Sequence, residues 1–276
     1  MDWTVYPDTP ISRLPRPLRY PVLLLRNVLT LLRLMPKPSE APSQPDGPDY
    51  VYEADGLATV YFSPFLADTT WSGAYEEMAR DWYPDQPGFD IRWRMWILTS
   101  VARQVRPLPG DIAEFGVYRG GCARMILETV GLDAGRRYHL FDTFAGIPDS
   151  ELTERERVEG YAGRLADTSV EVVEERLHPW RDALVFHPGD VFETATTADT
   201  GALSLVHMDL NASAPTRVAL EYAYPRLVPG AAIVFDDYGW DPTSYEQRDV
   251  IEDFCRPLRE SVIALPSGQA LLIKLP

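Results

Sequence analysis

Short apolar segments alternate with amphipathic helices from residue 90 onward, and this alternation restricts the possible fold more than any other feature. The segments that indicate strands are Asp111–Gly116, Arg137–Phe141, Ala183–His187, Leu203–Asp209 and Gly230–Asp236. Helical spacing is found over Trp93–Val105, Gly120–Val130, Val170–Leu177, Ala214–Tyr224 and Tyr245–Arg256. Strands joined through helices run parallel, whereas Val262–Leu265 and Ala270–Lys274, joined by a short turn, indicate an antiparallel edge hairpin. We therefore expect an α/β fold with a doubly wound, mostly parallel, seven-stranded sheet.

The first 89 residues differ from this main domain, which we place at residues 90–276. Residues 1–49 combine a basic amphipathic helix over Pro21–Met35 with a Pro-rich linker over residues 36–49. The helix either packs against its own domain or a second copy, or makes a peripheral membrane contact through residues 11–36. Residues 50–89 form an aromatic-rich helical or lid segment, whose aromatic rings either bind a ligand or pack in the core. The apolar stretch from Leu14 to Met35 is interrupted by Arg16, Arg19, Arg26 and Arg33, and no small-residue cleavage site follows it, so we expect neither a signal peptide nor a membrane span.

Net charge and cysteine content narrow the choice of partners. The chain carries a net charge of −15, so phosphate backbones repel it and nucleic acid is not an expected partner. It has two cysteines and no C-x-x-C pattern, which leaves a structural zinc site without support and fits a reducing cytoplasm.

A glycine-rich turn follows the first strand of the main domain. Glu114 precedes Gly116, and Gly120 begins the next helix, so the spacing is not that of the dinucleotide fingerprint G-x-G-x-x-G. Glycines allow backbone N–H groups to approach a ligand closely, and an acid before the turn suits a cationic ligand better than a pyrophosphate. The alternative is a tight strand–helix turn that needs glycine only for its conformation.

Two further acids follow the second and third strands. Asp142 has the position from which a carboxylate binds ribose hydroxyls, and Asp190 can accept a hydrogen bond from an adenine amino group. Each alone could be a solvated loop residue. Together, at the carboxyl ends of neighbouring strands, they predict a nucleoside cleft.

Three aspartates follow the fourth and fifth strands at the same edge of the sheet: Asp209, Asp236 and Asp237. Adjacent carboxylates repel one another, and a hard divalent cation such as Mg²⁺ relieves that repulsion. A metal of this kind could lower the pKa of a hydroxyl and fix its orientation for reaction. The alternative is that one aspartate caps the next helix and another pairs with an arginine.

At these residues the chain resembles the macrocin O-methyltransferase family of sugar methyltransferases. The matching segments are Gly110–Gly121, Leu140–Pro148, Pro188–Thr194, Tyr224–Gly230 and Asp236–Gly239. The resemblance implies a Rossmann-like, class I S-adenosylmethionine (SAM)-dependent methyltransferase domain after an N-terminal helical extension. It implies metal ligation by Asp209, Asp236 and Asp237. Cofactor binding is assigned to Glu114, Gly116, Tyr118, Gly120, Asp142, Thr143, Phe144, Asp190 and Val191.

The expected reaction is transfer of a methyl group from SAM to a sugar hydroxyl, with a divalent metal orienting the hydroxyl. Asn211 departs from the family pattern, which usually has a second acid there, and an amide cannot accept the proton. We therefore assign catalysis to Asp209, Asp237 and His207, with the lid at residues 149–168 as another source of a carboxylate. Family habit also suggests a homodimer. The alternative functions are a nicotinamide-dependent oxidoreductase and a SAM-binding protein without catalysis.

Overall fold

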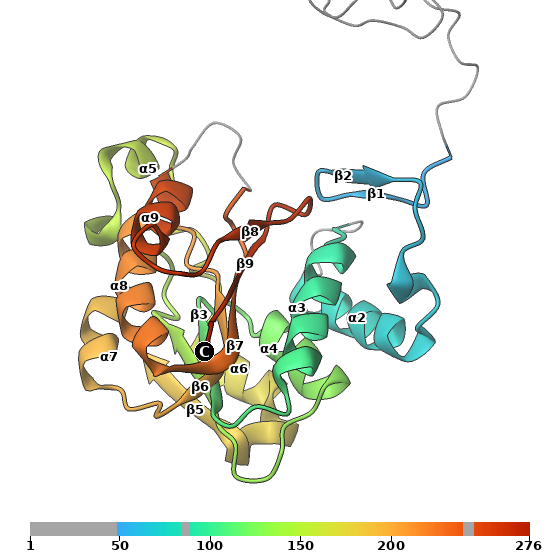
Figure 1. Ribbon diagram of the computed structural model, residues 1–276, viewed down its shortest axis with the longest axis horizontal. Coiled ribbons are helices and arrows are strands. Elements are labelled where there is room, and N and C mark those ends of the chain that lie inside the picture. Colours follow the sequence, from blue (N-terminus) through green and yellow to red (C-terminus); the bar gives the residue numbers. More distant parts are fainter. Residues whose placement is uncertain (1–48, 84–88, 240–245) are drawn as a thin grey trace, which may run out of the picture. The chain divides into compact units, whose positions relative to one another are not determined.

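The computed structural model describes residues 49–83, 89–239 and 246–276 (Figure 1). Residues Tyr50–Pro276 form one compact unit. The expected helix over Pro21–Met35, the linker and the proposed membrane contact lie outside the described residues. Among the helices that are described, none is long and apolar enough to cross a membrane.

A seven-stranded sheet lies at the centre of the fold, in the order β5-β4-β3-β6-β7-β9-β8. Its strands are β3 (Asp111–Phe115), β4 (Tyr138–Asp142), β5 (Leu184–Pro188), β6 (Leu203–Met208), β7 (Leu227–Phe235), β8 (Ile263–Ala264) and β9 (Ala270–Ile273). The first five run parallel, and β9 pairs antiparallel with β7 and β8. The expected fold class and the antiparallel edge hairpin are confirmed. The chain order reverses beside β3, where α/β sheets bind their ligands.

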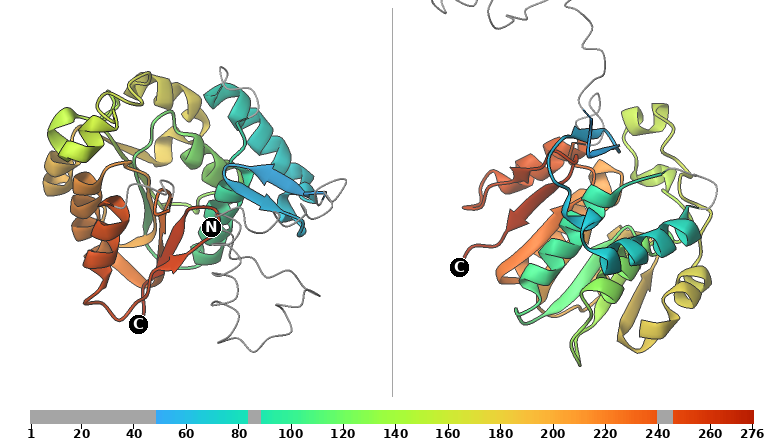
Figure 2. Two further views of the ribbon diagram at one scale, coloured as in Figure 1. Left: turned by 90° about the horizontal axis from the view of Figure 1, so that it is seen from above. Right: turned by 90° about the vertical axis from the view of Figure 1, so that its right-hand side faces the viewer.

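Helices cover both faces of the sheet (Figures 1 and 2). The helices are α2 (Thr69–Trp82), α3 (Arg92–Val105), α4 (Gly121–Thr129), α5 (Glu154–Val158), α6 (Val170–Arg176), α7 (Val191–Thr197), α8 (Ser213–Ala223) and α9 (Glu246–Cys255). Short 3-10 turns span Pro64–Leu66, Asp149–Glu151, His178–Ala183 and Tyr224–Arg226. One apolar cluster joins α2, α3 and α4 to alternate strand residues such as Ile112 and Leu205. The other cluster joins α8 and α9 to the intervening residues of the same strands, such as Ala113 and Val206, because successive side chains of a strand point to opposite faces of the sheet.

Residues 50–83 are part of the first of these clusters. They form a hairpin of β1 (Tyr52–Ala54) and β2 (Leu57–Thr59), followed by α2. Most of their aromatic side chains are buried, and Trp71 stacks on Tyr75 with ring centroids 5.6 Å apart. Packing in the core is therefore the main role of these rings. Trp82 and Tyr83 also line the cavity described below.

Candidate active site

The carboxyl ends of neighbouring strands are tied together by backbone hydrogen bonds. The N–H of Asp209 donates to the carbonyl of Phe115 at 2.7 Å, and that of Asp236 donates to Met208 at 2.9 Å. The N–H of Gly116 donates to Phe141 at 2.9 Å. These bonds place the segments after β3, β6 and β7 side by side, as the sequence predicted.

Gly116 sits where two of these segments cross closely. Its φ is +86°, and a Cβ built there would lie 1.8 Å from the carbonyl oxygen of Asp209. No side chain fits in that space, because the atom it meets belongs to the backbone of the neighbouring strand. Glycine is therefore required here both for its conformation and for the close approach of β3 and β6.

Asp142 organises the loops after β3 and β4. One carboxylate oxygen accepts the N–H groups of Val117 and Tyr118 at 2.6 and 2.8 Å, and the other accepts that of Phe144 at 2.7 Å. Tyr118 and Phe144 both have positive φ, at +51° and +53°, which is unfavourable for aromatic residues. The carboxylate thus stabilises two strained turns at the edge of the cleft.

A cavity of about 280 Å³ opens beside these turns. Of the residues predicted to bind the cofactor, Glu114, Gly116, Tyr118 and Asp142 line it, while Thr143 lines a smaller adjoining cavity of about 50 Å³. Gly120, Phe144, Asp190 and Val191 line neither cavity. Both cavities include Asp209 and Asn211, so they are neighbouring parts of one cleft.

Glu151 lies next to Asp190 and lines the smaller cavity. It belongs to the lid that follows β4, and its side chain is nearly buried. Burial, and next the neighbouring carboxyl of Asp190, raise the pKa of Glu151 to about 8. A protonated Glu151 can therefore donate a hydrogen bond to the carboxylate of Asp190 at neutral pH.

Glu114 is buried in the floor of the larger cavity. Its carboxylate accepts a hydrogen bond from the Tyr138 hydroxyl at 2.6 Å and lies 3.8 Å from Nδ1 of His207. Burial raises the pKa of Glu114, and the contacts with His207 and Tyr138 oppose that rise. The nearby thiol of Cys122, on α4, also has a raised pKa because of its burial. The floor thus presents a carboxylate with little solvent around it.

The three predicted aspartates do come together, with different partners. Asp209 and Asp237 are within hydrogen-bonding reach of each other, and burial followed by the charge of Asp209 raises the pKa of Asp237 to about 7. Asp236 instead forms an ion pair with Arg94 and accepts a hydrogen bond from Gln269 at 2.7 Å. The pairing of one aspartate with an arginine is therefore found at Asp236, while Asp209 and Asp237 lie side by side, with Arg94 3.8 Å from Asp237.

Asn211 fixes the orientation of Asp209. Its side-chain amide donates to Oδ1 of Asp209 at 3.1 Å, and its own φ is +58°, a conformation that asparagine tolerates better than most residues. The residue that replaces the expected acid is thus a hydrogen-bond donor to the carboxylate pair.

His207 is fully buried and lines neither cavity. Its Nε2 lies 3.7 Å from Asp236, so the ring is placed between Glu114 and Asp236, beyond hydrogen-bonding distance of both. A side chain without exposed surface is badly placed to take a proton from a bound acceptor. The arrangement favours a positioning role for His207 over the direct catalytic role that the sequence suggested.

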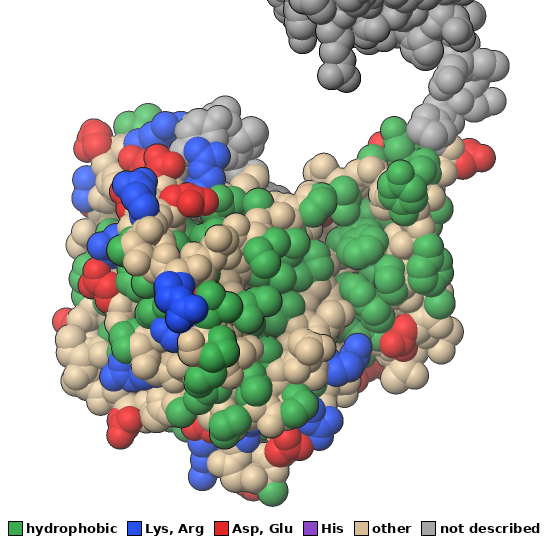
Figure 3. All heavy atoms as spheres, viewed as in Figure 1, with side chains coloured by type: hydrophobic (Ala, Val, Ile, Leu, Met, Phe, Trp, Pro, Cys, Tyr) green, Lys and Arg blue, Asp and Glu red, His purple; other side chains and the backbone are tan. Residues whose placement is uncertain are grey.

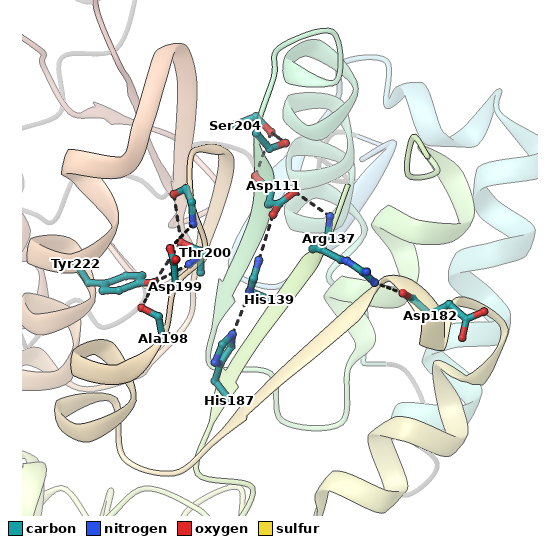
Figure 4. A network of polar contacts seen from close by, with 12 residues as sticks. Asp111, Arg137, His139, Asp182, His187, Ala198, Asp199, Thr200, Ser204 and Tyr222 are labelled. Carbon is teal, nitrogen blue, oxygen red and sulfur yellow. Dashed lines mark hydrogen bonds and ion pairs between the residues drawn. The ribbon is translucent and has the colours of Figure 1, made fainter. Parts of the chain in front are cut away.

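His139 belongs to a separate network (Figure 4). Its two ring nitrogens contact Nε2 of His187 at 3.0 Å and the carboxylate of Asp111 at 3.3 Å. The ring of His187 in turn stacks on Phe141, with centroids 4.1 Å apart. Phe141 packs in the cluster that contains α8 and α9, whereas Ile112, which lies on the same face of the sheet as Glu114, packs in the other cluster. His139 therefore lies on the face of the sheet away from the carboxylates.

Arg94, Cys122 and Gln269 belong to the site but were not identified from the sequence. Arg94 comes from α3 and Gln269 from the β8–β9 hairpin, far from the strand ends in sequence. Arg94 is one of three arginines in α3, so its charge alone did not distinguish it. No spacing pattern marked Gln269.

The strand order and the acid-bearing glycine turn define the class of the Rossmann-like, SAM-dependent methyltransferase fold. The match to a family model is specific. The chain belongs to the macrocin-O-methyltransferase (TylF) family, whose model matches residues 66–259.

Among curated relatives, the chain is 36% identical over 157 residues to the 8-demethyl-8-(2,3-dimethoxy-alpha-L-rhamnosyl)-tetracenomycin-C 4'-O-methyltransferase of Streptomyces olivaceus. That match covers 53% of this chain and 58% of the relative. It is 32% identical over 143 residues to the mycinamicin III 3''-O-methyltransferase of Micromonospora griseorubida, covering 48% and 56%. The chain thus spans little more than half the length of these relatives.

Solved structures show the same fold. The O-methyltransferase NovP matches with a TM-score of 0.62 and 21% identity, over 77% of this chain and 98% of that one. The calicheamicin methyltransferase CalS11 matches with a TM-score of 0.56 and 21% identity, over 85% and 99%.

Proposed function

We propose that this chain transfers a methyl group from SAM to a hydroxyl of a sugar unit, with a divalent cation orienting that hydroxyl. The observation that carries the proposal is one cavity lined both by the buried acid Glu114 and by the carboxylates of Asp209 and Asp237. A cationic donor and a metal-bound hydroxyl would then meet in the same space. Family membership and the sugar O-methyltransferases among the relatives support the same reaction.

The cleft suits a nucleoside with a cationic amino-acid part. Glu114 offers a negative floor with low solvent exposure, where electrostatic attraction is strong. Asp142 retains acceptor capacity for ribose hydroxyls, because its Oδ1 receives one backbone N–H. Glu151 lines the smaller cavity, and its Oε1, which is buried without a hydrogen-bond partner, can accept a hydrogen bond from the adenine amino group. SAM would supply the methyl group as an electrophile on its sulfonium.

The carboxylate pair fits a hard dication. Asp209 and Asp237 are close acids with oxygen ligands only, and Oδ2 of Asp237 is buried without a hydrogen-bond partner. These two residues would hold the ion, and Asp236 would join them once freed from Arg94. Bound there, Mg²⁺ would lower the pKa of the acceptor hydroxyl.

The chain also supplies an acceptor for the hydroxyl proton. As the S–CH₃ bond breaks and the O–CH₃ bond forms, that proton leaves the sugar oxygen. Asp209 and Asp237 face the cavity, while Asn211 holds Asp209 in place through its amide. We assign the proton to this carboxylate pair, since the amide of Asn211 cannot take it.

An apolar surface lies over the β1–β2 hairpin (Figure 3). Tyr61 and Phe62 are 79% and 68% exposed, and Val51, Val60 and Leu66 are exposed near them. Exposed apolar patches of this kind mark association surfaces. We propose that the chain forms a homodimer through this surface. Sedimentation analysis tests this, and a monomer at all concentrations would contradict it.

Transfer of labelled methyl from SAM to a panel of glycosides tests the function, with and without EDTA. We expect transfer that EDTA abolishes and that Mg²⁺ restores. Asp209→Asn should remove the activity, whereas Asp199→Asn, at an exposed acid before β6, should leave it unchanged. Tight binding of S-adenosylhomocysteine without any transfer would instead support a non-catalytic SAM-binding protein. Lack of SAM binding would refute the proposal.

A further inference from the structure

Arg94 lies among the carboxylates that a dication would need. Its guanidinium forms an ion pair with Asp236 and lies 3.8 Å from a carboxylate oxygen of Asp237. It also lies 3.8 Å from Asp55, in the turn of the β1–β2 hairpin. The side chain is 11% exposed and lines the larger cavity. Arg94 therefore contacts acids on two sides, one in the hairpin and two after β7.

The acids around Arg94 outnumber it. Asp55, Asp209, Asp236 and Asp237 give this centre a net charge of −3 when every acid is ionised. Burial would lower the pKa of the guanidinium, but the surrounding acids raise it above its ordinary value. Arg94 is thus a permanent cation, and the centre remains negative enough to attract another.

We propose that Arg94 is a resident cation of the carboxylate centre that sets how tightly the centre holds a dication. The inference rests on the proposed function, because it concerns the metal of that same site. A dication between Asp209 and Asp237 repels a guanidinium within a few ångströms. It also competes with that guanidinium for Asp236. Asp55 offers the displaced guanidinium a second partner, so Arg94 need not lose all its compensation when an ion binds.

A purely structural ion pair would behave differently. If Arg94 served only to keep the aspartates in place, its removal would disorder them and weaken the binding of every cation. If it competes with the dication, its removal strengthens binding. The sign of the change therefore separates the two roles.

The test measures Mn²⁺ affinity by electron paramagnetic resonance of the free ion, without SAM and at fixed pH and ionic strength. Arg94→Gln should bind Mn²⁺ at least about tenfold more tightly than the unmodified chain. Arg92→Gln is the matched control, since Arg92 lies two residues away on α3 and pairs with Asp90 and Glu76. Its affinity should stay within about twofold, because the charge it removes is farther from the centre.

Binding of S-adenosylhomocysteine shows whether each variant is folded. Equal or weaker Mn²⁺ binding by folded Arg94→Gln would overturn the inference. If Arg94→Gln does not fold, Asp55→Asn decides. It removes the second partner of the guanidinium and should weaken Mn²⁺ binding at least about threefold. Unchanged affinity in that variant would overturn the inference as well.

The methyl-transfer assay keeps this inference separate from the proposed function. Transfer by the unmodified chain, combined with no gain of affinity in Arg94→Gln, would refute the inference alone. A gain of affinity, combined with no transfer to any glycoside, would support the inference and count against the proposed acceptor.

Discussion

Replacement of Asp142 by asparagine tests whether one carboxylate holds the two loops of the cleft. An asparagine can place its oxygen toward Val117 and Tyr118, but its NH₂ group then faces the N–H of Phe144. One charge-assisted bond is lost, a donor remains unsatisfied, and the two other bonds become weaker. Hydrogen bonds to charged groups contribute about 1.5–3 kcal/mol each, so we expect Asp142→Asn to lower the free energy of unfolding by about 2–4 kcal/mol.

Asp190→Asn is the matched control. Asp190 is the N-cap of α7 and accepts one backbone N–H, from Phe192 at 2.7 Å. Asparagine is an equally good N-cap, so the expected change is below about 0.5 kcal/mol. The side-chain oxygen of an asparagine at position 190 can still accept the hydrogen bond from the protonated Glu151. Urea unfolding without ligand gives both values, provided the slope m is unchanged.

Binding of S-adenosylhomocysteine provides the second measurement. The variant at position 142 should bind more weakly, because the turn at Tyr118 is no longer held at its positive φ. Equal, small losses of stability in the two variants would show that Asp142 does not hold the two loops. Normal ligand binding by the variant at position 142, combined with unfolding at a much lower urea concentration, would contradict the expected weaker binding.

Three further predictions follow from the same structure. Gly116→Ala should lower the free energy of unfolding by more than about 3 kcal/mol, because a Cβ would overlap the backbone of Asp209. An unfolding midpoint near that of the unmodified chain would contradict this. Burial lowers the pKa of His187 from 6.5 to about 4, so its imidazole binds a proton more readily in the unfolded chain than in the folded one. As pH falls from 6.5 to about 4, the free energy of unfolding should therefore drop by about 1–2 kcal/mol. His187→Gln should flatten the fall of Tm with acid, whereas His178→Gln, at an exposed histidine, should not. Burial raises the pKa of Asp237 to about 7, so ionisation of this carboxyl destabilises the folded state as pH rises. In EDTA, Asp237→Asn should raise the free energy of unfolding by about 2–4 kcal/mol at pH 8 and by little at pH 4. Equal gains at the two pH values would contradict this.

The sheet could be predicted from the sequence because its central strands are short, apolar and bounded by turn residues. The predicted start of β3 at Asp111 and that of β6 at Leu203 agree with the structure. The strand β7 begins at Leu227, three residues before the predicted start, because the sheet continues through a Pro-Gly pair that reads as a turn. The β1–β2 hairpin was not predicted, since its strands have three residues each and no clear alternation.

The candidate site was predictable only where its residues follow the strands directly. The acids at 142, 209 and 237 line the cleft, with Asp236 buried beside them, because parallel strands bring their carboxyl ends to one edge. Their partners could not be predicted, because Arg94 and Gln269 arrive from a helix and a hairpin through tertiary packing. The burial of His207 could not be predicted either, because strand alternation indicates the face of the sheet on which a residue lies but not how deeply it is buried.

The contact of Gln269 with Asp236 makes the edge hairpin part of the candidate active site. Its amide also donates to the backbone carbonyl of Arg94 at 3.3 Å, and Ser267 in the same turn donates to its side-chain oxygen at 3.1 Å. In a chimera whose loops near the acceptor and whose β8–β9 turn come from different relatives, Asp236 would therefore be misplaced. Transplanting substrate preference between relatives requires this distant turn to travel with the loops.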